Sequence, residues 1–167
     1  SALAYREDMG LSTPLFPEEG RAEVSEEELE RVTFYVAHLA VPAPRHLPED
    51  LRGKRLFREV RCASCHRERL GGLPAYTDLL LHDMGEALAD GVAEGAASPA
   101  EWRTPPLWGI GLTRKVLGEG VYLHDGRAQS LEEAILWHGG EAEEAKRRFM
   151  ALPKADREAL LRFLRGL

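Results

Sequence analysis

Residues 62 to 66 read Cys62-Ala63-Ser64-Cys65-His66, and they contain the only two cysteines of this 167-residue chain. In a C-x-x-C-H pentad the two thiols can add to the vinyl groups of a haem, and the histidine that follows can ligate the iron from one face. The pentad therefore predicts one covalent haem c, attached through Cys62 and Cys65, with His66 as the proximal iron ligand.

Three other interpretations of the cysteines compete with haem attachment: a thioredoxin-like redox pair, half of a zinc site, and two ordinary buried cysteines. A structural zinc site needs four nitrogen or sulfur ligands, and the sequence has no second cysteine pair and no closely spaced histidine pair to complete one. A thioredoxin-like pair follows a strand, whereas an amphipathic helical pattern precedes this pentad. The pattern favours haem, and thiols that titrate without haem would instead indicate a thiol-disulfide oxidoreductase.

The segments on both sides of the pentad have helical periodicity, and no segment has the alternating pattern of a strand. A helix that starts near Pro48 leads into the pentad, and its Gly53 and Phe57 lie where the first helix of a compact cytochrome c crosses the last. The last helix begins at Pro153, and its apolar residues are Leu160, Phe163, Leu164 and Leu167. This order of elements predicts an all-α, class I cytochrome c-like haem domain with long loops.

The first 45 residues have a different character. Residues 1–24 are irregular and polar, and Ser25 with Glu28 then forms a capping box that opens a helix. The apolar residues of this helix, at helical spacing, are Leu29, Val32, Val36 and Leu39. We therefore expect an N-terminal arm with one amphipathic helix over residues 1–45, and the haem domain over residues 46–167.

Shorter elements are expected after the pentad. Ser98-Pro99-Ala100-Glu101 predicts the start of a short helix that Thr104-Pro105-Pro106 ends. A second capping box opens a helix over residues 131–138, and a polar helix follows it. Residues 67–81 and 107–127 are predicted to be long loops that wrap the cofactor.

The second axial ligand decides what a haem does, because an open position allows peroxide chemistry, histidine gives a low-potential relay, and methionine raises the potential. The candidates are His82, Met84, His124 and His138. Among them His138 ends an apolar helical stripe, and Gly139-Gly140 after it would let backbone approach a flat macrocycle closely. We predict His138 as the distal ligand, with Met84 as the alternative.

Charge and composition limit the partners and the compartment. The formal net charge of −6 at pH 7 argues against nucleic acid and favours a basic protein partner. The chain has no apolar run that could span a bilayer and no leader, yet haem is attached to C-x-x-C-H outside the bacterial inner membrane, so we expect a periplasmic protein whose leader was removed by processing or truncation. Asparagine is absent and Gln129 is the one glutamine, which fits a thermophile, although GC-rich coding gives a similar composition.

Four motifs resemble the bacterial di-haem oxidoreductases that were once predicted to be thiol oxidoreductases, relatives of the di-haem cytochrome c peroxidases and of the di-haem enzyme that matures methylamine dehydrogenase. In order along the chain, they are LLLHDMG at 79–85, EWRTPPLWG at 101–109, LHDGR at 123–127 and LEEAILWHGGEA at 131–142. The stretch from Asp8-Met9-Gly10 to Phe16-Pro17-Glu18 is also similar to the segment ahead of the second haem in that family, so the resemblance covers nearly the whole chain.

The family has two C-x-x-C-H sites in two cytochrome-like domains, and this chain has one. The resemblance therefore implies the C-terminal, electron-relay half of a di-haem peroxidase-like enzyme. In the peroxidases the distal methionine of this haem follows a His-Asp-Gly and a Leu-Glu-Glu-Ala motif, and His138 occupies the matching position, which implies bis-histidine iron. A proline near the peroxidases' inter-domain calcium is replaced here by Val121, so calcium has little support.

The sequence thus predicts an electron-transfer domain with one covalent haem, ligated by His66 and His138, and with no catalytic residue of its own. Its partner would be a second haem domain or a soluble redox protein. The alternative is a self-sufficient haem peroxidase-type enzyme with an open or labile distal site.

Overall fold

The computed structural model describes residues 1–45 and 51–167. These residues divide into two compact units, Ser1–Val41 (unit 1) and Pro42–Leu167 (unit 2). The predicted helix start near Pro48 falls outside the described residues, and the boundary predicted between residues 45 and 46 stays a prediction. No helix in the described ranges is both long and apolar enough to cross a membrane.

Unit 1 contains two helices, α1 (Ala2–Glu7) and α2 (Glu26–Ala37). The short α1 was not predicted, because six residues are too few to display a helical period. The predicted capping box of α2 is confirmed: the Glu28 N–H donates to Ser25 Oγ (3.2 Å), and the Ser25 N–H donates to Glu28 Oε2 (2.9 Å). None of the residues of α2 is fully buried.

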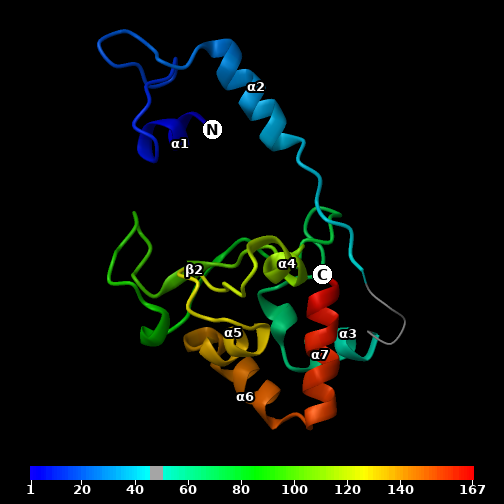
Figure 1. Cartoon of the computed structure of the whole chain (residues 1–167). Coiled ribbons are helices and arrows are strands. Elements are labelled where there is room, and N and C mark those ends of the chain that lie inside the picture. Colours follow the sequence, from blue (N-terminus) through cyan, green and yellow to red (C-terminus); the bar gives the residue numbers. More distant parts are fainter. Residues whose placement is uncertain (46–50) are drawn as a thin grey trace. The chain divides into compact units, whose positions relative to one another are not determined.

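Unit 2 is built on a crossing of α3 (Leu51–Glu59) and α7 (Lys154–Gly166), as Figure 1 shows. Gly53 sits at the crossing, where a Cβ atom would press on the Ala159 carbonyl oxygen and would lie 2.6 Å from the Cβ of Phe163. A larger residue at this position would therefore force the helices apart. The predicted crossing of the first helix of the haem domain over the last is confirmed.

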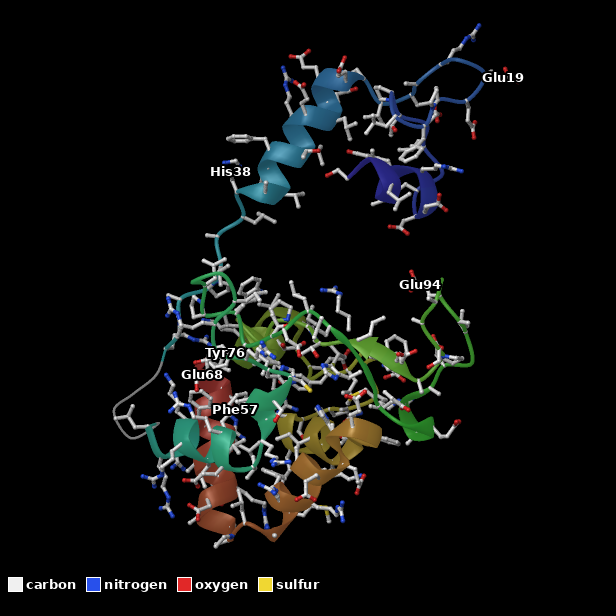
Figure 2. The ribbon with its side chains drawn as sticks, turned by 180° about the vertical axis from the view of Figure 1, so that it is seen from behind. Glu19, His38, Phe57, Glu68, Tyr76 and Glu94 are labelled. Carbon is white, nitrogen blue, oxygen red and sulfur yellow. The ribbon has the colours of Figure 1, made fainter. Side chains whose placement is uncertain are left out.

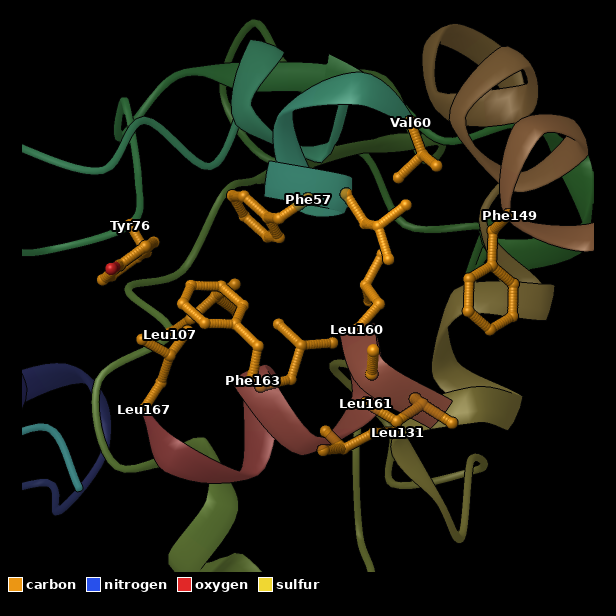
Figure 3. Close-up of a cluster of buried hydrophobic side chains, with 13 residues drawn as sticks. Phe57, Val60, Tyr76, Leu107, Leu131, Phe149, Leu160, Leu161, Phe163 and Leu167 are labelled. Atoms are coloured by element: carbon orange, nitrogen blue, oxygen red, sulfur yellow. The ribbon is translucent and has the colours of Figure 1, made fainter. Parts of the chain in front are cut away.

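The core of unit 2 fills the space around this crossing (Figure 3). Phe57, Tyr76 and Phe163 pack with their rings tilted or edge to face, with centroids 5.6 to 6.0 Å apart. Cys62 and Ala63 pack against the same cluster. The hydrophobic core of unit 2 thus fixes the position of the pentad.

The remaining helices of unit 2 are α4 (Thr113–Leu117), α5 (Leu131–Trp137) and α6 (Glu143–Ala151). The predicted helices near 131–138 and after it are confirmed as α5 and α6. The prediction of a continuous loop over 107–127 is wrong, because a 3-10 turn (Ile110–Leu112) and α4 lie within it. This short helix ends at Gly118, whose φ of 79° is left-handed.

Two short strands, β1 (Leu81–Asp83) and β2 (Glu101–Arg103), form an antiparallel pair with His82 opposite Trp102. The fold is therefore mainly helical rather than all-α, and the short helix predicted from residue 98 is wrong. The Glu101 N–H donates to the Ser98 carbonyl in a turn, and prolines 105 and 106 favour an extended backbone before them. Pairing with β1 then completes the strand.

Candidate haem-binding site

The pentad forms one tight turn after α3. Arg61 adopts a left-handed conformation with φ of 71°, and Cys62–Ser64 follows as a 3-10 turn. The His66 N–H donates to the Cys62 carbonyl oxygen at 3.0 Å, as in an α-helical turn. Residues at i, i+3 and i+4 share one face of such a turn, so the two thiols and the imidazole project to the same side.

Electrostatic contacts hold the loop that follows the pentad against α3. Glu68 forms ion pairs with Lys54 (3.3 Å) and with Arg58, both of which lie on α3. Glu68, Phe57 and Tyr76 are labelled in Figure 2, where they cluster at the side of unit 2 that carries α3. Side chains on both sides of the pentad therefore restrain His66.

The two thiols are protonated at neutral pH. Burial raises the pKa of Cys62 to about 12. Burial also raises the pKa of Cys65, and the negative charges of Asp78 and Glu141 add to this effect. A reactive redox cysteine needs a lowered pKa, so this environment disfavours a thiol-disulfide oxidoreductase.

His66 is held as a neutral imidazole with one free ring nitrogen. Its Nδ1 lies 3.1 Å from the Tyr76 carbonyl oxygen, which can only accept a hydrogen bond, so Nδ1 carries the proton and donates. Burial lowers the pKa of His66 to about 4, and a charge on the nearby His138 would lower it further. Within the described part of the chain, Nε2 of His66 makes no hydrogen bond and keeps its lone pair.

His138, which lies near enough to His66 to influence its pKa, repeats the same arrangement. It is the residue that ends α5, and its Nδ1 lies 2.7 Å from the carbonyl oxygen of Ala134 one turn earlier. Burial lowers its pKa, and its Nε2 likewise has no hydrogen-bond partner among the residues described. The structure thus brings together two half-buried neutral imidazoles, each with an Nε2 that has no hydrogen-bond partner among the described residues.

Met84 lies beside His138, but its backbone rather than its side chain defines the contact. A Cβ at Gly139 would be 2.8 Å from the Met84 carbonyl oxygen, and one at Gly140 would be 2.8 Å from the Gly85 nitrogen. The two glycines thus admit the backbone of residues 83–85, and the prediction that they let backbone approach a macrocycle stays a prediction. Met84 is half-buried next to the pocket and remains the alternative ligand.

His82 has a different environment, because carboxylates occupy both of its ring nitrogens. Nε2 lies 3.1 Å from Asp78 Oδ2, and Nδ1 lies 2.8 Å from Glu141 Oε2. The hydrogen bond to Glu141, followed by that to Asp78, raises the pKa of His82 above its ordinary value. The two carboxylates therefore favour the doubly protonated form of His82, which has no lone pair for a metal.

Sequence reasoning missed Asp78 and Glu141. Burial alone would raise the pKa of Asp78, but hydrogen bonds from the Leu80 N–H and from His82 bring it below the ordinary value. Glu141 also accepts a hydrogen bond from the Asp83 N–H at 3.0 Å and so ties β1 to the segment after His138. Cys65 Sγ lies within 4.8 Å of the ligand atoms of Asp78 and His82, so this network borders the pentad.

The fourth candidate ligand, His124, stacks on Trp102 with ring centroids 3.5 Å apart, and the indole Nε1–H donates to the Leu88 carbonyl. This parallel stacking gives the imidazole a packing role against β2.

The calcium prediction, which came from the resemblance alone, stays a prediction.

Comparisons with known proteins concern the family and the fold of the chain. The sequence model of a family described as "Di-haem oxidoreductase, putative peroxidase" matches residues 71–167. No curated protein matches the chain. A solved structure of hydrazine synthase from Kuenenia stuttgartiensis, pressurised with 20 bar xenon, is similar with a TM-score of 0.59 and 20% sequence identity. The alignment covers 86% of this chain but only 56% of that chain, and at this identity it supports the fold alone.

Proposed function

We propose that this chain, which belongs to the di-haem oxidoreductase family, binds one haem c through Cys62 and Cys65 and relays electrons with His66 and His138 as axial ligands. Membership of the family makes haem-based redox chemistry its general function. The observation that carries the finer proposal is the matched pair of imidazoles, each with Nδ1 bonded to a main-chain carbonyl and Nε2 free.

The residues present fit such a cofactor. A metal-ligating histidine usually donates its second ring N–H to a carbonyl or carboxylate, which fixes the tautomer and the ring orientation. The imidazole must also be neutral to bind a metal, and burial lowers the pKa of both histidines. When bound, a haem supplies one-electron chemistry at the iron. The carbonyls of Tyr76 and Ala134 would hold the two rings in place.

Two imidazole ligands favour a relay over an enzyme site. With both axial positions taken by strong ligands, no position stays open for peroxide or oxygen. The partner would be a second haem domain or a soluble redox protein, and the net charge of −6 favours a basic one. A cytochrome c-like fold, a periplasmic location and a thermophilic source belong to the same proposal.

Carbon monoxide binding tests this function against its alternative, a peroxidase-type enzyme with an open or labile distal site. We expect the reduced holoprotein to refuse carbon monoxide, and the oxidised protein to be low-spin and to lack the far-red methionine-to-iron charge-transfer band. Rapid uptake of carbon monoxide by the reduced wild-type protein would replace the relay with the peroxidase-type alternative.

A further inference from the structure

Helices α2 and α7 share one apolar pattern. When they are aligned on their N-cap residues, Ser25 and Pro153, four apolar positions coincide, at intervals of three, one and three residues. The matched pairs are Val32 with Leu160, Tyr35 with Phe163, Val36 with Leu164, and Leu39 with Leu167. This spacing places the first three pairs on one face of each helix, and Leu39 and Leu167 follow just beyond the two helix ends.

The burial of the two faces is opposite. All four residues of the α7 set are at most 5% exposed, in the core that α3 and α7 share. On α2, Tyr35 is 66% exposed and Val36 is 54% exposed, and Leu39, just beyond the helix end, is 57% exposed. The shared apolar pattern is thus buried on α7 in unit 2 and exposed on α2 in unit 1.

The backbone contact that seats α3 on α7 can be reproduced on α2. Gly53 lies so close to α7 that a Cβ there would meet the carbonyl oxygen of Ala159 and the Cβ of Phe163. In the alignment these atoms correspond to the carbonyl of Arg31 and the Cβ of Tyr35. Arg31 of α2 stands where α7 has Ala159. The Arg31 side chain is 73% exposed and pairs with Glu27, so it leaves the Arg31 carbonyl and the Tyr35 Cβ open to a docking helix.

The charges of the two helices also specify what would cover α2. The first half of α2 is acidic, with Glu26, Glu27, Glu28 and Glu30. The helix α3 is basic: its one acidic residue is Glu59, and its basic residues are Arg52, Lys54, Arg55 and Arg58. In unit 2, Arg52 pairs with Asp156 of α7, and the matching residue of α2 is Glu28. A basic amphipathic helix therefore suits α2 as α3 suits α7.

We infer that the exposed face of α2, formed by Tyr35, Val36 and Leu39, docks the basic amphipathic helix that precedes the C-x-x-C-H of a second haem unit. A second copy of this chain does not fit, because its own α3 is already packed on α7. This inference goes beyond the proposed relay: it concerns unit 1 and holds whichever residue ligates the iron in unit 2.

A synthetic peptide can stand in for the docking helix. We would titrate the isotope-labelled holoprotein with an acetylated, amidated peptide of residues 51–61 and follow amide resonances by NMR. We expect saturable shifts at Tyr35, Val36 and Leu39. The paired substitution Tyr35→Glu, Val36→Glu should raise the Kd of the peptide at least about tenfold, which is roughly 1.4 kcal/mol, without changing the haem spectrum.

Matched controls make the result specific. A peptide with Phe57→Glu should lose binding, because its central apolar anchor is gone, while the chain variant Val116→Glu, at a site 74% exposed on α4, should bind the wild-type peptide normally. Leu39 lies beyond the end of α2, so the substitution Leu39→Lys leaves the helix intact. It should raise the Kd of the peptide, as the paired substitution does.

Two results would overturn the inference. One is the absence of a saturable shift at α2, or equal binding by the wild type and the Tyr35→Glu, Val36→Glu variant. The other is a dimer of the wild-type holoprotein, detected by sedimentation velocity, that the paired substitution converts to a monomer, since the face would then bind a second copy.

Discussion

The pocket histidines, His66 and His138, differ from His82 in the groups that surround them, although all three are partly buried in unit 2. Each pocket histidine donates Nδ1–H to a main-chain carbonyl, and burial lowers its pKa. His82 instead lies between the carboxylates of Asp78 and Glu141, which raise its pKa.

This difference separates a metal ligand from a structural cation. A neutral imidazole with a free Nε2 can bind iron, whereas an imidazolium between two carboxylates has no lone pair to give. The role of each histidine therefore follows from its hydrogen-bond partners in space, and the predictions below test that contrast.

The largest expected effect comes from removing the thioether bonds that would define the pocket. The paired substitution Cys62→Ala, Cys65→Ala should abolish covalent haem, because no thiol remains to add to the vinyl groups, and should destabilise unit 2, whose core packs against Cys62. Acid-acetone extraction followed by absorbance of the protein fraction measures the loss. Ser64→Ala is the control and should keep its haem. A folded, colourless wild-type protein would end the haem proposal.

The next effect distinguishes His138 from His82 directly. His138→Ala should open the distal position, so that a high-spin component appears and the reduced protein binds carbon monoxide. His82→Gln removes an imidazole of similar burial without touching the pocket ligands, and its reduced form should refuse carbon monoxide as the wild type does. If His82→Gln opened the iron and His138→Ala did not, the contrast between the two environments would be wrong.

Local patterns in the sequence predicted the elements whose determinants are close in the chain. Ser25 and Glu28 are three residues apart and form the expected capping box, and the stripe that ends at His138 forms α5. The Gly53 crossing was also predicted, because helical periodicity on both sides identified the two helices that meet there. In each case the signal lies within one or two helical turns.

The remaining features depend on partners far apart in the chain. Glu141 meets His82 across 59 residues, and nothing next to either residue indicates the pair. The strands β1 and β2 have three residues each, too short to display alternation, so their pairing is visible only in three dimensions. The close approach of Gly139 and Gly140 to the backbone of residues 83–85 was missed for the same reason, because the two segments are far apart in the sequence.

A smaller effect concerns the pH dependence of stability that His82 contributes. Because the folded state raises the pKa of His82, its added stability is complete below the unfolded pKa of about 6.5 and is lost as pH rises through the higher folded pKa. We expect His82→Gln to cost about 1 kcal/mol at low pH, since Glu141 is largely exposed and solvent screens its charge. Urea unfolding at a series of pH values measures this cost. It should shrink as pH rises above 6.5, and a cost that grew with pH would contradict the assigned charge.

The smallest expected effect is that of Met84→Ala in the wild-type background. If His138 holds the iron, the absorption spectrum should stay unchanged, and stability should fall by about 1 kcal/mol, because Met84 is only half-buried. The same substitution is informative in the His138→Ala background. The Met84 backbone lies against Gly139, the residue next to His138, so the Met84 side chain is the candidate to replace the lost ligand. If Met84 ligated part of the iron in His138→Ala, a methionine-to-iron band would accompany the high-spin component there and vanish in the double variant, with a further gain in carbon monoxide binding. If instead the wild type shows that band and Met84→Ala removes it, Met84 is the distal ligand, and the carbonyl-bonded imidazole of His138 is a packing residue of the pocket.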